Sequence, residues 1–225
     1  MPTTKISPEI VSPSTLKAKP TRYTALAGII GPILFTVGFL AQQAFRGDAF
    51  DPVAKPVSAL EAGPLGWIQQ ANFVVFAFFM LAFTAGLHRG IDGSRRGALG
   101  PVLLGTASTG LFIAAAIPLR EDAGGNVYDP GGHFVAGVTF FLGTALAMLV
   151  LSRRLAKDPH FRPLATYTAI CGGLALCGFV VMARFAMPDS TPLHDVAGLI
   201  QRGVLLVVTF PCLVLLAARL RSKGN

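Results

Sequence analysis

Six long stretches of mostly apolar residues constrain the fold of this chain more than any other feature. They cover residues 25–44, 65–87, 98–117, 134–151, 164–187 and 196–218. Each is long enough to cross the roughly 30 Å hydrocarbon core of a bilayer as a helix that rises about 1.5 Å per residue. Strands of a membrane barrel would be about ten residues long and would alternate in polarity. The pattern therefore predicts an all-α fold, a polytopic membrane bundle of six transmembrane helices.

The composition agrees with a membrane-embedded chain and excludes a soluble enzyme. Hydrophobic residues make up 52% of the chain and charged residues 13%, against about 25% charged in soluble domains. The net charge of +8 comes from 19 Lys and Arg, which are spread along the chain without a contiguous basic recognition element. We therefore expect the lipid bilayer as a partner and no nucleic acid.

The first 22 residues differ from the rest of the chain. They contain four Pro and seven Ser or Thr, and no apolar run longer than two residues. Such a segment cannot bury enough apolar surface to fold. We expect residues 1–22 to form a disordered cytoplasmic tail and residues 23–221 to form the six-helix membrane domain.

The distribution of Lys and Arg predicts the orientation. Six spans place both termini on one side, and that side carries 14 Lys and Arg, whereas the other side carries 5. Cytoplasmic loops are enriched in these residues, so we expect both termini in the cytoplasm. Of the 11 acidic residues, 8 lie on the opposite, outer side, which is where we look for a site.

Two arginines near the outer ends of the last two spans are candidates for ligand binding. Ionisable residues within spans are costly and by default mark functional sites. Arg184 lies about one turn before the end of the fifth span, and Arg202 lies about two turns into the sixth. Asp195 precedes Arg202 by seven residues, which places both on one helical face. His194 and Gln201 share that relation, and we expect Arg202 to pair with Asp195.

Polar residues of the second span and of the connection before it complete the candidate set. Gln69 and Asn72 are three residues apart and face the same way on a helix. Asp51 and Glu61 are acidic residues of the first outer connection. Ser58 precedes Glu61 by three residues, which indicates a capping box at the start of a short interfacial helix.

Two histidines at the starts of the fourth and sixth spans permit a metal site. His133 and His194 lie where the helix dipole favours the neutral imidazole that binds metals. An outer carboxylate, from Asp122, Asp129 or Asp195, could complete a His/His/carboxylate set. No H-E-x-x-H spacing occurs. Haem ligation by the two histidines, and simple helix capping, are the alternatives, so cofactors stay open.

Residues 51–73, DPVAKPVSALEAGPLGWIQQANF, resemble the signature of a prokaryotic membrane family, domain of unknown function 998 (DUF998). Further on, Pro118 and Asp122 at the end of the third span and His133 at the start of the fourth match the same family. The similarity covers about residues 23–220. Where the family pattern has an Asp and a Gly near positions 59 and 61, this chain has Ala59 and Glu61. The resemblance implies six spans in a prokaryotic cell membrane and no particular chemistry.

Three functions fit these observations. The first is binding or transport of a small anionic molecule, a lipid headgroup or a lipid-like ligand in an outer pocket, since Arg suits carboxylate and phosphate. The second is a metal-dependent hydrolase of lipid-like substrates, with His133, His194 and an outer Asp activating water. The third is a structural or assembly protein without a ligand, in which Arg184 and Arg202 only reach the interface and pair with acids.

Overall fold

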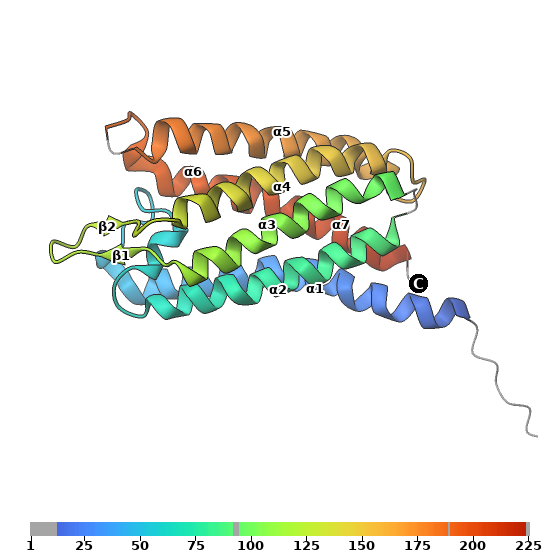
Figure 1. The fold of residues 1–225 in the computed structure, drawn as a ribbon, viewed down its shortest axis with the longest axis horizontal. Helices are drawn as coiled ribbons and strands as arrows, with labels where there is room; N and C mark the ends of the chain where they lie inside the picture. The colour runs from blue at the N-terminus through green and yellow to red at the C-terminus, as the bar shows by residue number, and fades with distance from the viewer. Residues whose placement is uncertain (1–12, 92–94, 189, 224–225) are drawn as a thin grey trace, which may run out of the picture.

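The computed structural model describes residues 13–91, 95–188 and 190–223 and forms an elongated bundle of helices (Figure 1). The long helices are α1 (Pro13–Arg46), α2 (Gly66–Gly90), α3 (Leu99–Ala116), α4 (His133–Leu155), α5 (Ala165–Val181), α6 (Ala197–Gly203) and α7 (Phe210–Lys223). Short 3-10 turns are η1 (Gly47–Ala49), η2 (Val57–Glu61), η3 (Arg95–Ala98), η4 (Arg162–Leu164) and η6 (His194–Val196). Two π-helical segments, η5 (Met182–Ala186) and η7 (Val204–Thr209), extend α5 and join α6 to α7.

The prediction of an all-α bundle with six spans is confirmed. Six helical stretches of the described chain are long and apolar enough to cross a membrane, namely Arg22–Ala49, Gly66–Gly90, Leu99–Ala116, His133–Leu155, Arg162–Ala186 and His194–Lys223. Within the expected tail, residues 13–22 continue α1 as helix. Residues 1–12 lie outside the described residues.

The two ends of the bundle differ in their connections (Figure 1). At the end that we call the hairpin end, residues 117–132 form a two-stranded antiparallel hairpin, β1 (Arg120–Glu121) with β2 (Val127–Tyr128). The connections 47–65 and 187–196 lie at the same end. At the opposite end, which we call the terminal end, α1 begins and α7 finishes.

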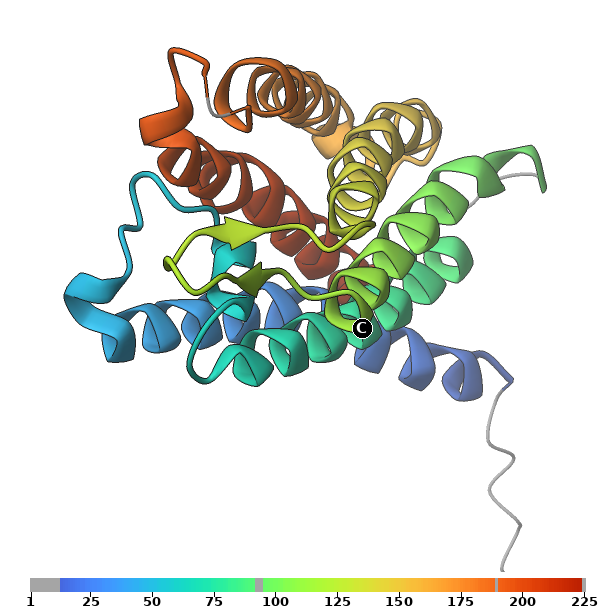
Figure 2. The ribbon, with the colours of Figure 1, turned by 60° about the vertical axis from the view of Figure 1, so that its left-hand side comes forward.

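Each helix packs mainly against its neighbour in the chain, and α7 packs against α1. Figure 2 shows the helices following one another around the bundle in chain order, with α6 and α7 between α5 and α1. Aromatic rings fill the middle. Phe35 of α1 stacks on Phe76 of α2 with centroids 4.8 Å apart, and Phe76 also meets Phe210 of α7 at 5.4 Å and Phe140 of α4 at 6.2 Å. These rings tie four helices together.

Both π-helical segments lie just ahead of a proline. Pro211 has no N–H to bond the carbonyl one turn earlier, and its ring would clash with that carbonyl. The wider turns of η7 end at Thr209, two residues before Pro211. In the same way η5 ends at Ala186, two residues before Pro188, with the Met187 N–H donating to Met182. The local widening is a known response to helix disruption.

Side chains at the terminal end fasten the connections to the helices. The Arg154 guanidinium donates to the backbone carbonyls of Gly97 and His88. Lys223 of α7 pairs at 3.0 Å with Asp158, which is almost fully buried. These contacts join α4 and α7 to the connections at the terminal end.

Candidate functional site

Asp129 fixes the start of α4. Its carboxylate accepts hydrogen bonds from the backbone N–H groups of Gly131, His133 and Phe134 at 2.8–3.1 Å. Burial raises the pKa of Asp129, but these N–H groups outweigh it and hold the pKa below its usual value. Gly132 precedes the helix with φ of +130°, a conformation that suits glycine. Together these features place His133 at the first turn.

His133 points into the bundle and meets Glu61 of η2. The His133 Nδ1 atom lies 3.0 Å from the carbonyl oxygen of Ile117 and 3.2 Å from the Glu61 Oε2 atom. The Leu119 backbone N–H donates to the same Glu61 oxygen at 3.4 Å. Because a carbonyl oxygen only accepts, Nδ1 carries a proton in its bond to Ile117. Ile117, at the end of α3, and Glu61 of η2 therefore hold the imidazole in place.

Glu61 is buried and uncharged at neutral pH. Its side chain has 0% exposed surface, and its Oε1 atom has no hydrogen-bond partner within the described chain. Burial raises the pKa of Glu61 to about 8, and the Leu119 N–H offsets part of that rise. Glu61 therefore keeps its proton near pH 7 and can act as a hydrogen-bond donor.

A cavity of about 120 Å³ lies beside His133. Among the described residues, no Lys, Arg, Asp or Glu lines it, and most of its walls are aromatic or aliphatic. All six spans or their connections contribute. The lining includes Phe35, Val57, Ser58, Phe73, Leu111, Ala114, His133, Phe134, Gly137, Phe140, Phe141, Phe179, Met182, Ala183, Met187, Gln201 and Leu205.

Three polar side chains face this apolar space. His133 and Gln201 are 7% and 6% exposed, and Ser58 is half-buried. Gln201 uses its Oε1 atom to accept a hydrogen bond of 2.6 Å from the backbone N–H of Val57. Over the described ranges, no hydrogen bond is formed by the Gln201 Nε2 atom or the Ser58 hydroxyl. The cavity thus offers unused hydrogen-bonding groups at one side of an apolar chamber.

The cavity lies where α4 and α5 diverge. The two helices touch through Ala145 and Ala175 and separate toward the hairpin end (Figure 1). There Phe134 and Val138 of α4, with Phe179 of α5, line the chamber. Phe134 is 58% exposed, so the wall between α4 and α5 borders the outer surface of the bundle, which is the surface that meets lipid in a membrane.

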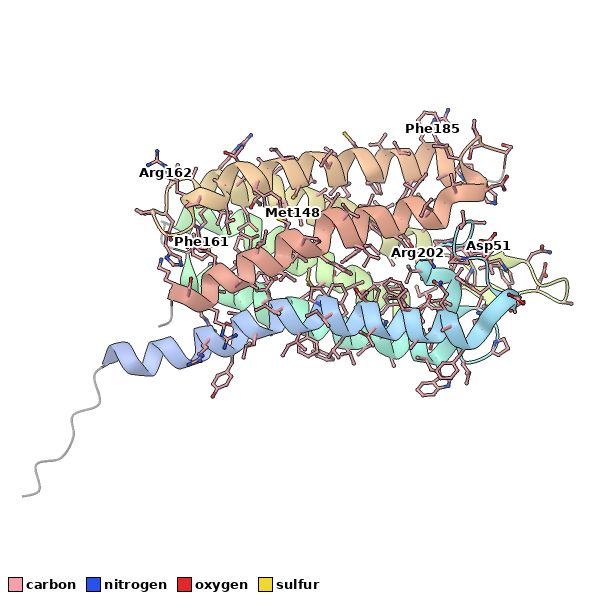
Figure 3. All side chains as sticks on the ribbon, turned by 180° about the vertical axis from the view of Figure 1, so that it is seen from behind. Asp51, Met148, Phe161, Arg162, Phe185 and Arg202 are labelled. Carbon is pink, nitrogen blue, oxygen red and sulfur yellow. The ribbon has the colours of Figure 1, made fainter. Side chains whose placement is uncertain are left out.

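Arg202, the strongest sequence candidate for anion binding, is bound to protein. One of its terminal nitrogens donates to the carbonyl oxygens of Pro52, Lys55 and Gly198 at 2.7–3.0 Å, and the other donates to Gln43 at 3.0 Å. The expected pairing with Asp195 is wrong, because two carbonyls of the 51–57 loop, the Gly198 carbonyl and Gln43 bind the guanidinium instead. Figure 3 shows Arg202 beside the loop of Asp51.

The 51–57 loop binds the first turn of α6 through backbone hydrogen bonds. The Asp51 carboxylate accepts from the N–H groups of Val53 and Ala54, which turns the carbonyls of these two residues outward. They accept hydrogen bonds from the N–H groups of Leu199 and Gly198 at 2.9 and 3.1 Å. These donors belong to the first turn of a helix, which has no internal partner for them.

The remaining predicted residues do not reach the cavity. Arg184 is exposed, as is its neighbour Phe185 at the outside of the bundle (Figure 3). Asp195 is exposed, and His194 is half-buried with its Nδ1 atom 3.3 Å from the carbonyl of Ala186. The cavity side of this segment is formed by Met182 and Ala183 instead.

Gln69 and Asn72 lie between α1 and α2. The Asn72 amide donates to Gln69 at 3.3 Å and to the carbonyl of Phe35 at 3.0 Å. Both are buried and join helices. The capping box of Ser58 and Glu61 is wrong, because η2 begins after Pro56 without a side-chain cap, and Glu61 turns to His133.

The predicted metal set is not assembled. Among the described residues, no group of three or more His, Cys, Asp and Glu side chains could hold a metal ion. His133 and His194 face different carbonyls, and Asp122 accepts N–H groups of Gly124 and Asn126 in the hairpin turn. The metal-dependent hydrolase therefore has no ligand set in this part of the chain.

The fold defines an α-helical membrane protein with six spans, and its hairpin end holds a buried Glu–His pair beside an apolar cavity. The chain belongs to the family of proteins of unknown function DUF998, whose sequence profile matches residues 29–218. The resemblance seen in the sequence is thereby confirmed. Neither the curated proteins nor the solved structures gave a match.

Proposed function

We propose that this protein binds a lipid-like ligand in the cavity between α4 and α5. The observation that carries the proposal is an uncharged chamber of about 120 Å³ with apolar walls and a polar side at His133 and Gln201. Ligand pockets combine mostly apolar linings with a few placed polar groups. The position of the cavity against the lipid-facing surface supports entry from the bilayer.

A small anionic molecule fits the cavity less well than a lipid-like ligand. Anion sites use Arg or Lys as donors, and neither residue type is among the described residues that line the cavity. Arg202 donates to three carbonyls and one amide oxygen, while Arg184 is exposed away from the chamber. The geometry therefore favours a ligand whose binding depends on apolar contact.

We also propose that the protein spans the prokaryotic cell membrane with both termini in the cytoplasm. The excess of Lys and Arg at the terminal end supports this orientation. The hairpin end and the cavity would then belong to the outer half of the membrane. A ligand would reach the site from the outer leaflet.

The test of ligand binding uses two matched glycine substitutions. A Cβ atom added at Gly137 would meet no atom within 4 Å, and Gly137 lines the cavity. Gly173 is equally open but lies outside the lining. We expect Gly137→Leu to fill the chamber and lower the amount of co-purified lipid about tenfold or more. The measurement is mass spectrometry of lipid per protein after washing in detergent.

Gly173→Leu is the control, because it adds the same side chain to a helix without filling the cavity. It should keep the wild-type amount of lipid, and both variants should remain monodisperse. Equal lipid in the wild type and Gly137→Leu would show that the chamber binds no lipid and would leave a structural role.

A further inference from the structure

We propose that the cavity selects a lipid whose head group is uncharged and carries a hydroxyl, such as a long-chain alcohol, over charged amphiphiles of equal chain length. This inference rests on the proposed function and names the class of its ligand. It follows from the hydrogen-bonding groups that face the chamber, from the lack of charge around it, and from its size.

The polar groups of the chamber include both donors and acceptors. The Gln201 Nε2 atom is a donor, since its Oε1 atom is engaged with Val57. The His133 ring also lines the chamber, and its Nδ1 atom bonds the Ile117 carbonyl. Ser58 can serve as either. A hydroxyl head group donates and accepts, so it can satisfy both kinds of atom, whereas a sulfonate only accepts and an ammonium only donates.

Among the residues that the structure describes, no opposite charge lines this chamber to compensate a charged head group. The nearby Glu61 is uncharged at neutral pH because burial raises its pKa to about 8. Moving an ion into such a place without a partner is strongly unfavourable. Arg202 does not supply the missing charge, since it is not among the lining residues and its terminal nitrogens bind the 51–57 loop and Gln43.

The size of the chamber indicates which part of the ligand lies inside. Its volume of about 120 Å³ is close to that of an engineered apolar cavity of about 150 Å³ that holds one benzene molecule. Only the head group and the first few carbons of a long chain fit. The rest of the chain would pass between Phe134 and Phe179 toward the lipid-facing surface.

The test measures competition by three ten-carbon amphiphiles. The full-length protein in lipid nanodiscs is labelled at pH 7.5 with a long-chain alcohol that carries a photoactivatable diazirine, and mass spectrometry locates the label. We expect labelling in residues 133–141 and 179–187. We expect 1-decanol to block labelling at about one tenth of the concentration that decanesulfonate or decylammonium requires.

Two outcomes separate this inference from the proposed function. A charged competitor that acts at the same or a lower concentration than decanol would overturn the hydroxyl preference and leave lipid binding intact. Labelling that avoids both segments, and that Gly137→Leu does not reduce, would overturn lipid binding itself.

A variant at the polar side of the chamber tests the hydrogen bonds directly. Ser58→Ala removes one hydroxyl from a half-buried position that forms no bond elsewhere in the described chain, so the fold should be kept. The loss of one hydrogen bond should weaken decanol about threefold and leave decanesulfonate unchanged. Gln201→Met, which removes the donor, should also weaken decanol. Unchanged decanol competition in both variants would overturn the inference.

Discussion

A buried carboxyl whose pKa is raised makes a fold less stable as the pH rises. Glu61 has an ordinary pKa of 4.5 when unfolded and about 8 in the folded protein. Between these values the folded state holds a proton that the unfolded state has released, so the free energy of unfolding falls with increasing pH. One proton corresponds to a slope of at most about 1.4 kcal/mol per pH unit.

Replacing Glu61 with Gln should remove this dependence. We expect the apparent melting temperature of the wild type in detergent to decrease from pH 6.5 to pH 8, and that of Glu61→Gln to stay nearly level. The amide keeps the shape of the protonated acid and its oxygen can still accept from Leu119. Thermal unfolding followed by circular dichroism at several pH values measures the difference.

In this pH interval the titration of Glu61 is separated from that of Asp122 and Asp129. The pKa of Asp122 is lowered by hydrogen bonds from Asn126, and that of Asp129 is also below its usual value, so both are ionised throughout. Parallel curves for the wild type and Glu61→Gln would contradict the burial of an uncharged Glu61.

Sequence reasoning found several of these residues without finding their partners. His133 and Glu61 were each candidates, but 72 positions separate them, and no local pattern links a helix start to a 3-10 turn so far away. Helical spacing placed Arg202 and Asp195 on one face, which is correct only within a regular helix. In the structure Asp195 lies in η6, before α6 begins, and four oxygen acceptors bind the two terminal nitrogens of the arginine. Gln201 was noted for its spacing, although only the fold shows that it borders a cavity.

At the scale of elements, the contact between the 51–57 loop and α6 holds the hairpin end together. Gly198 allows the two backbones to approach, because an added Cβ would collide with the carbonyl oxygens of Lys55 and Pro52. A displaced loop would also move Val57, which binds Gln201 at the cavity. The loop therefore connects the packing of α6 to the shape of the site.

Gly198→Ala should destabilise the protein by about 1–3 kcal/mol, because two backbone segments must separate. Gly203→Ala, in the same helix, is the control, since nothing lies within 4 Å of its added Cβ, and alanine favours helix by up to about 1 kcal/mol. Chemical denaturation in mixed micelles compares the two variants. A Gly198→Ala protein as stable as Gly203→Ala would show that the loop does not pack closely on α6.

The spans themselves were predictable because each must be apolar over a length that the bilayer sets. The two π-helical segments were not, since proline predicts a disrupted helix but does not specify how the backbone adjusts. The conformation of the 51–57 loop could not be predicted from the sequence either. Its structure depends on donors from α6 that are more than 140 positions away.

At the scale of the whole molecule, the arrangement of the helices creates the site. Each helix packs against its chain neighbours, but α4 and α5 touch only through part of their length, and the cavity occupies the space where they part. Hydropathy identifies spans and leaves their angles open, because every lipid-facing and protein-facing side is apolar. The architecture was therefore predictable, and the cavity was not.

The orientation of the molecule is the remaining prediction, and it decides which leaflet the cavity faces. Lys and Arg number 14 on the side of the termini and 5 on the side of the hairpin, and this bias sets topology in bacterial membranes. We expect a reporter that is active only in the cytoplasm to work when fused at Asn225 and to fail when inserted at Gly125. Gly125 lies in the turn of the exposed hairpin with φ of +81°, so an insertion there should not disturb the bundle. A reporter that is active at Gly125 would show the opposite orientation, with the cavity in the inner leaflet.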